Sequence, residues 1–150
     1  MRHTRGRRMR LAALLALAGG AALAACARPT GLTHEEAKAL IARGVPNPGT
    51  VDRFLVDAGG SAGDSLFVWL TEDTAESDAL MEALARHNAR VAVYGPVPAK
   101  SQHVVRNALE RLADGRARGS ELIWIGPVAD RPGLEERAQK AGVRFSVVER

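Results

Sequence analysis

The sequence predicts a small three-layer α/β sandwich, Rossmann-like or flavodoxin-like, with a mostly parallel sheet of about 4–5 strands preceded by one helix. Short, continuous apolar runs are typical of strands buried on both faces. They alternate with segments in which apolar residues recur at helical spacing. This alternation implies crossovers that place helices over a parallel sheet. The apolar runs lie at 66–70, 91–94 and 122–125, and residues 143–148 are expected to close the chain as a further strand.

The segment that precedes these runs carries a helix start signal and a weaker strand. Thr33 with Glu36 three residues later fits a capping box, an apolar stripe follows, and Gly44 is a stop signal. Residues 51–56 favour a modest strand. Because a glycine-rich turn follows it, we expect this strand to add to the sheet as an antiparallel edge.

Three further helices are expected between the buried strands, each with an apolar stripe at helical spacing. Their ends are predicted from capping residues, from proline near a helix start and from glycine after a helix end. The first runs from about Thr74 or Ser77 to Asn88, the second is capped by Ser101, and the third starts near Pro132 and ends at Gly142.

The first 26 residues are those of an exported protein. An arginine-rich head without acidic residues is followed by an uncharged run over 11–25. That run is shorter than the about 20 apolar residues of a membrane-spanning helix, so it indicates a secretory signal peptide. At its end, Leu23-Ala24-Ala25-Cys26 resembles the lipobox of bacterial membrane lipoproteins, and Cys26 is the only cysteine in the chain.

The resemblance implies that Cys26 is the lipid attachment site. Its sulfur would receive a diacylglycerol, the peptide would be cut before it, and the new amino terminus would be acylated, with palmitate for example. Ala27, which is not an aspartate, would favour the outer membrane in a bacterium with two membranes. The chain then divides into a signal peptide at 1–25, a lipidated cysteine and tether at 26–31, and one α/β domain at 32–150.

The positive net charge of the chain comes from its first ten residues. The net charge is +4, but five of the 21 basic residues lie in residues 1–10 and all 17 acidic residues follow Cys26, which leaves 16 basic and 17 acidic side chains from Cys26 onward. This balance does not support a nucleic-acid partner. The histidines and the one cysteine form no metal-binding motif, so we expect no metal and no cofactor.

The stretch GGSAGDSL at 59–66 fits two serine-esterase motifs, G-x-S-x-G around Ser61 and GDSL around Ser65. A nucleophile elbow needs a helix after the serine, whereas the run at 66–70 favours a strand. The G-x-N-D and Asp-x-x-His blocks of the GDSL esterase family are absent from the chain. We therefore interpret the stretch as a turn.

A short motif recurs after two of the apolar runs. Gly95-Pro96-Val97 returns as Gly126-Pro127-Val128, and at the same offset Lys100 corresponds to Arg131. Similar turns need similar residues, which is one explanation. The other is a ligand site, because both loops leave the carboxyl ends of strands, where open α/β sheets bind ligands. The candidate binding residues are Tyr94, Gly95, Lys100, Gly126 and Arg131.

Acidic residues also follow the 66–70 run, at Glu72, Asp73 and Glu76. Carboxylates at such a position could serve a site, but we expect them to complement the dipole of the helix that follows.

Together these observations favour a non-catalytic membrane lipoprotein that faces the periplasm. It would act as an accessory or assembly component of an envelope complex, with the bilayer and an envelope protein as partners. A domain that binds a small anion or a nucleotide-like ligand at the sheet edge is the alternative. A serine esterase using Ser61 or Ser65 is the second alternative.

Overall fold

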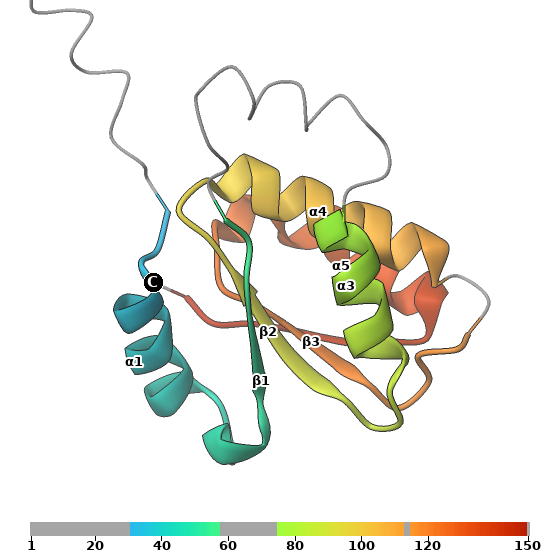
Figure 1. Ribbon diagram of the computed structural model, residues 1–150, viewed down its shortest axis with the longest axis horizontal. Helices are drawn as coiled ribbons and strands as arrows, with labels where there is room; N and C mark the ends of the chain where they lie inside the picture. The colour runs from blue at the N-terminus through green and yellow to red at the C-terminus, as the bar shows by residue number, and fades with distance from the viewer. Residues whose placement is uncertain (1–30, 58–74, 113–114, 150) are drawn as a thin grey trace, which may run out of the picture.

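The computed structural model describes residues 31–57, 75–112 and 115–149 (Figure 1). They form an α/β domain around a four-stranded sheet in the order β1-β2-β3-β4, in which all neighbouring strands are parallel. This confirms the predicted small α/β sandwich. The strands are β1 (Asp52–Leu55), β2 (Arg90–Tyr94), β3 (Glu121–Trp124) and β4 (Arg144–Val147).

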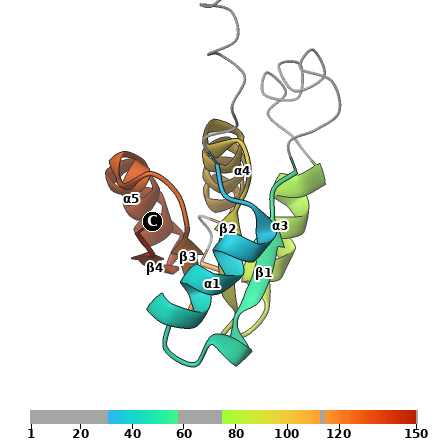
Figure 2. The same ribbon diagram turned by 90° about the vertical axis from the view of Figure 1, so that its left-hand side faces the viewer.

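Helices cover both faces of the sheet, but unequally. Because the strands lie in chain order, the three helices that connect them fall on the same face, and Figure 2 shows α3, α4 and α5 side by side there. Helix α1 covers the opposite face. The helices are α1 (His34–Gly44), α3 (Ala75–Ala85), α4 (Pro98–Arg111) and α5 (Arg131–Ala141), with 3₁₀ turns η2 (Pro48–Thr50) and η3 (Val128–Asp130).

The predicted capping signals of α1 and α5 are confirmed. The Thr33 hydroxyl accepts a hydrogen bond from the Glu36 amide, and the Glu36 carboxylate accepts one from the Thr33 amide at 2.9 Å. At the end of α5, Gly142 adopts a left-handed φ of 73°, which a glycine tolerates without strain.

Two sequence predictions about these elements were wrong. The first strand is not antiparallel: β1 pairs with β2 in parallel, because helix α3 carries the chain back to the start of the sheet between them. Helix α4 starts at Pro98, not after Ser101, since proline has no N–H to leave unpaired at a helix start. The strand predicted at 66–70 lies outside the described residues.

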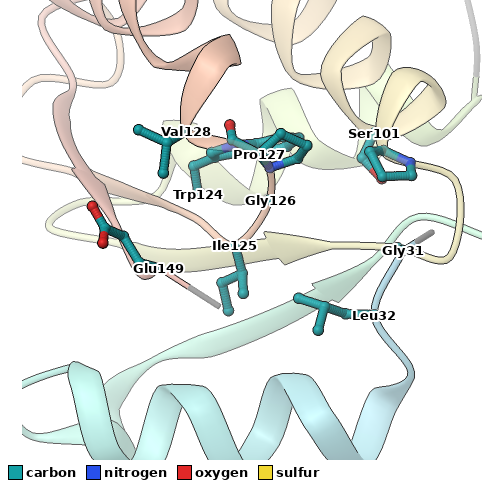
Figure 3. A pocket seen from close by; sticks show the side chains of 11 residues that line it. Gly31, Leu32, Ser101, Trp124, Ile125, Gly126, Pro127, Val128 and Glu149 are labelled. Atoms are coloured by element: carbon teal, nitrogen blue, oxygen red, sulfur yellow. The ribbon is translucent and has the colours of Figure 1, made fainter.

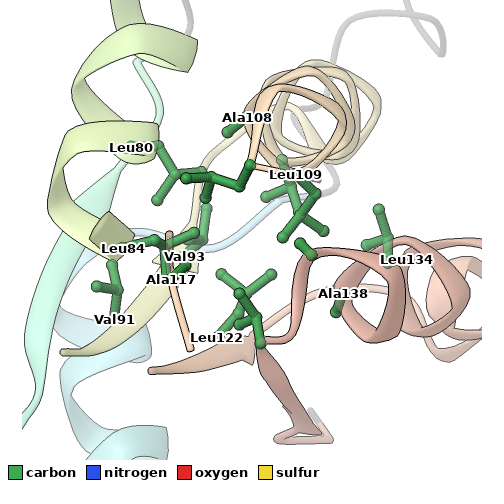
Figure 4. Close-up of a cluster of buried hydrophobic side chains, with 14 of the residues drawn as sticks. Leu80, Leu84, Val91, Val93, Ala108, Leu109, Ala117, Leu122, Leu134 and Ala138 are labelled. Atoms are coloured by element: carbon green, nitrogen blue, oxygen red, sulfur yellow. The ribbon is translucent and has the colours of Figure 1, made fainter. Parts of the chain in front are cut away.

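The apolar runs are continuous because the sheet has a core on each face. On β3, Leu122 and Trp124 face the three connecting helices, whereas Ile123 faces α1. The larger core, between the sheet and α3–α5, is seen in Figure 4. The smaller core under α1 includes Ile41 and Tyr94.

A polar network closes the amino-terminal edge of the sheet beside α1. Arg90 and Glu121, on neighbouring strands, form an ion pair of 2.8 Å with each side chain 19% exposed. Arg90 also donates to the Pro46 carbonyl at 2.9 Å and to the Thr50 hydroxyl at 2.8 Å. Ser146 on β4 donates to Glu121 at 3.1 Å. One arginine therefore joins the sheet to the loop after α1.

The same network sets the acidity of Glu121. Burial raises the pKa of its carboxyl, but hydrogen bonds from Arg90 and Ser146, with the charges of Arg90 and Arg144, bring the pKa below the ordinary value of 4.5. The ion pair with Arg90 is therefore maintained at neutral pH.

We predict that Arg90→Gln lowers the free energy of unfolding by about 1–3 kcal/mol, because Glu121 and the loop carbonyls lose their donor. The matched control is Arg86→Gln, which removes a 3.4 Å pair with Asp52 whose side chains are 68% and 64% exposed. This control should lose less than about 1 kcal/mol. Urea unfolding followed by circular dichroism measures both, and equal losses would contradict the role of Arg90.

Candidate functional site

A pocket of about 260 Å³ opens at the carboxyl edge of the sheet (Figure 3). Its walls come from four parts of the chain that are far apart in the sequence: residues 31–32, the 95–101 segment, the 124–128 segment and Glu149. All but the first follow the carboxyl end of a strand. The pocket therefore lies in the position where open α/β sheets bind ligands.

Two of the five predicted binding residues line this pocket. Gly95 follows β2 and Gly126 follows β3, and the parallel arrangement of the strands brings the two loops together. Neither position has room for a side chain: a Cβ on Gly95 would lie 2.5 Å from the Val56 carbonyl oxygen, and a Cβ on Gly126 would overlap the indole of Trp124. The repeated glycine is thus required by packing, whatever the pocket binds.

Tyr94, a third predicted residue, is not part of the pocket lining. Its ring belongs to the core under α1, and its hydroxyl lies 2.7 Å from Nδ1 of His34. The pKa of the Tyr94 hydroxyl is raised above its ordinary value, mainly by burial. The charge of Arg53 opposes this shift, and that of Glu35 adds to it. This contact fastens the start of α1 to β2.

Lys100 is buried in an ion pair beside the pocket. Its side chain is 5% exposed, and Nζ lies 2.8 Å from Glu76 Oε2 and donates to the Asp57 carbonyl at 2.7 Å. Glu76 also accepts from the Asp57 amide at 3.2 Å. Glu76 lies in the first turn of α3, as predicted. These contacts join the end of β1 to the starts of α3 and α4.

The charged side chain of Arg131 is directed to Glu135 and does not line the pocket. It lies at the start of α5, where Nε is 3.1 Å from the carboxylate of Glu135, and about half of each side chain is exposed. Neither Arg131 nor Lys100 is part of the pocket lining, so the structure does not bring the two predicted cations together in it. Within the described lining, Glu149 is the one ionisable side chain.

The chain enters the domain through the pocket wall. The Gly31 amide donates to the Pro96 carbonyl at 3.0 Å, and the Leu32 amide donates to the Gly95 carbonyl at 3.1 Å. A Cβ on Gly31 would overlap the Gly95 and Pro96 backbone, so this close approach needs glycine. Gly31 falls in the segment predicted to be a tether, and the sequence carries no local signal for this role in the pocket wall.

Several predicted sites fall outside the described residues, namely Cys26, Ser61 and Ser65. Over residues 31–57, 75–112 and 115–149, no cluster of three or more histidine, cysteine or acidic side chains could hold a metal ion. None of the helices in these ranges has both the length and the apolar character needed to cross a membrane.

Compared with known proteins, the chain matches no family model, no curated protein and no solved structure. The fold and the pocket define its class: a small α/β domain with an all-parallel sheet and a pocket at the carboxyl edge. What that pocket does must be argued from its own residues.

We predict that Gly95→Ala destabilises the domain by about 1–3 kcal/mol, the usual cost of overpacking. The new methyl group would lie 2.5 Å from the Val56 carbonyl oxygen and 2.6 Å from the Ser101 hydroxyl. Gly49→Ala is the matched control, since nothing lies within 4 Å of its Cβ position. Thermal unfolding should show a lower Tm for Gly95→Ala alone, and an unchanged Tm would refute the packing argument.

Proposed function

We propose that the protein is a membrane lipoprotein that faces the periplasm and presents its α/β domain, pocket edge first, to the bilayer surface. It serves as a non-catalytic accessory component of an envelope complex. One observation carries the proposal: Gly31, which lines the pocket, is only five residues from Cys26.

The length of the tether supports this orientation. Five fully extended residues span at most about 18 Å, because each residue adds no more than about 3.3–3.6 Å. Hydrogen bonds from Gly31 and Leu32 to the loop after β2 fix the chain from that point on. The other described end, Glu149, lines the same pocket (Figure 3). An anchor at Cys26 would hold the pocket edge close to the bilayer.

The anchor itself rests on the sequence of the leader. A basic head, a short apolar run and a lone cysteine at its end are the parts of a lipoprotein signal. Two or more acyl chains give stable attachment, at about 0.8 kcal/mol for each buried methylene. Ala27 favours the outer membrane where the cell has two membranes.

An accessory role needs a surface for a partner, and Val128 is our candidate for its centre. This residue stands at the pocket rim with 47% of its surface exposed, which makes it one of two large hydrophobic side chains exposed in the described part of the chain. A partner protein that packs on the pocket rim would bury this apolar side chain, which is favourable. The anion-binding alternative has no cation in the described lining to support it.

We predict that Cys26→Ser abolishes incorporation of an alkyne-tagged palmitate in growing cells and leaves the leader uncut, because the serine has no sulfur to receive the diacylglycerol. The control variant Ala27→Ser keeps the thiol and should be labelled like the wild type. Gel mobility and membrane fractionation report processing and anchoring. A labelled and processed Cys26→Ser protein would overturn the proposal.

We also predict that a photoreactive benzoylphenylalanine in place of Val128 crosslinks to the same envelope proteins each time in intact cells. The control position is Arg86, whose side chain is 68% exposed and pairs with Asp52 at the opposite edge of the sheet. Mass spectrometry identifies the attached proteins. The accessory role fails if both positions give the same products, or if Val128 gives none.

A further inference from the structure

We infer that the pocket binds a small apolar molecule that carries a positive charge, an amphipathic amine. This inference goes beyond the accessory role, and it rests on the proposed function only for the place of the pocket near a bilayer. Three observations support this inference. The pocket walls are apolar, several hydrogen-bond donors around the pocket are already engaged within the protein, and one carboxylate lies at the described rim.

The walls of the pocket are largely apolar. Trp124 and Ile125 are buried at the end of β3, Leu32 is buried at the start of the described chain, and Pro127 and Val128 complete the side toward α5. Figure 3 shows Leu32 and Ile125 on one side of the hollow with Trp124 and Pro127 on the other. At about 260 Å³ the space suits one aromatic ring or a branched alkyl group with a short chain, near the small end of ligand pockets.

Several polar hydrogens around the pocket are directed to the protein. The amide of Gly31 donates to Pro96, and the amide of Ile125 donates to Val93 at 3.0 Å. The Trp124 indole N–H donates to the Pro127 carbonyl at 3.2 Å. Proline at position 127 has no N–H at all. These donors are therefore not available to a bound anion.

Acceptors, in contrast, remain. The Ser101 hydroxyl is buried and donates to the Val97 carbonyl at 3.3 Å, so its lone pairs stay available to an incoming N–H group. Glu149 at the rim is exposed, and its carboxylate makes no hydrogen bond or ion pair within the described residues. A pocket that offers acceptors and one negative charge favours an ammonium group over a carboxylate or phosphate.

The nearby cations do not reverse this preference. The charge of Lys100 faces Glu76 at 2.8 Å, and that of Arg131 faces Glu135 at 3.1 Å. Each is paired within its own surroundings, and neither lines the pocket. The electrostatic field of the described lining is therefore set by Glu149.

The test uses membranes that contain the full-length protein and three matched photoreactive probes, built on phenethylamine, 2-phenylethanol and phenylacetate. Each carries the same diazirine and alkyne, so only the charge differs. Mass spectrometry locates the label along the chain. We expect the amine probe to label the peptides that contain residues 95–101 and 124–128 more strongly than the alcohol does, and the acid probe to label them least.

Two substitutions at one exposed residue test the charge argument. Glu149→Gln should reduce amine labelling about three- to fivefold, as expected for one partly exposed ion pair, and leave alcohol labelling unchanged. Glu149→Lys should reverse the order so that the acid probe labels best. The control is Glu135→Gln, which removes an exposed carboxylate that does not line the pocket.

Three results would overturn the inference: no label in the pocket peptides, equal labelling by amine and acid, or amine labelling that the Glu149 variants leave unchanged. Combining the amine probe with the palmitate tag on the wild-type protein separates the two proposals. A wild-type protein that takes up no palmitate tag but whose pocket peptides are labelled by the amine supports the pocket without the anchor. A palmitate-tagged protein whose pocket is not labelled supports the anchor without the amine site.

Discussion

Two backbone hydrogen bonds determine how this domain is put together. Gly31 and Leu32 donate to the Pro96 and Gly95 carbonyls, which lie just beyond the end of β2. They place Leu32 in the core beneath α1, so this helix starts from a fixed point. They also form one wall of the pocket, so the described chain begins at that edge. The position of α1, the shape of the pocket and the edge at which the described chain begins therefore share one cause.

The charge of Lys100 lies near the pocket at the carboxyl edge of the sheet but is not available inside it. The sequence predicts Lys100 as a ligand residue because it follows a strand and a Gly-Pro turn. Burying an ammonium costs several kcal/mol unless it is paired and hydrogen-bonded. Glu76 and the Asp57 carbonyl meet this need, at 2.8 and 2.7 Å. Once the lysine is used to join β1, α3 and α4, it strengthens the edge and contributes no free charge to a ligand.

Much of the fold could be predicted from local patterns, and little of the site could. Continuous apolar runs identified β2 and β3, because strands buried on both faces lose the alternation of a half-exposed strand. Gly95 and Gly126 were found because each follows such a run. The direction of β1 relative to β2 depends on helix α3, which carries the chain back before β2 begins. No residue within the strand indicates this direction. Leu32 and Glu149 meet at the pocket from opposite ends of the domain, a contact without any local signal.

The proposed anchor and the proposed ligand are physically compatible. An amphipathic amine concentrates at a bilayer because its apolar part enters the interface while its charge stays in water. An anionic surface adds attraction that extends over about 8 Å at physiological salt. A tether of at most about 18 Å would keep the pocket near this enriched layer. Weak binding in a small pocket would then suffice for occupancy, because the local concentration of the ligand, and not the affinity alone, sets the bound fraction.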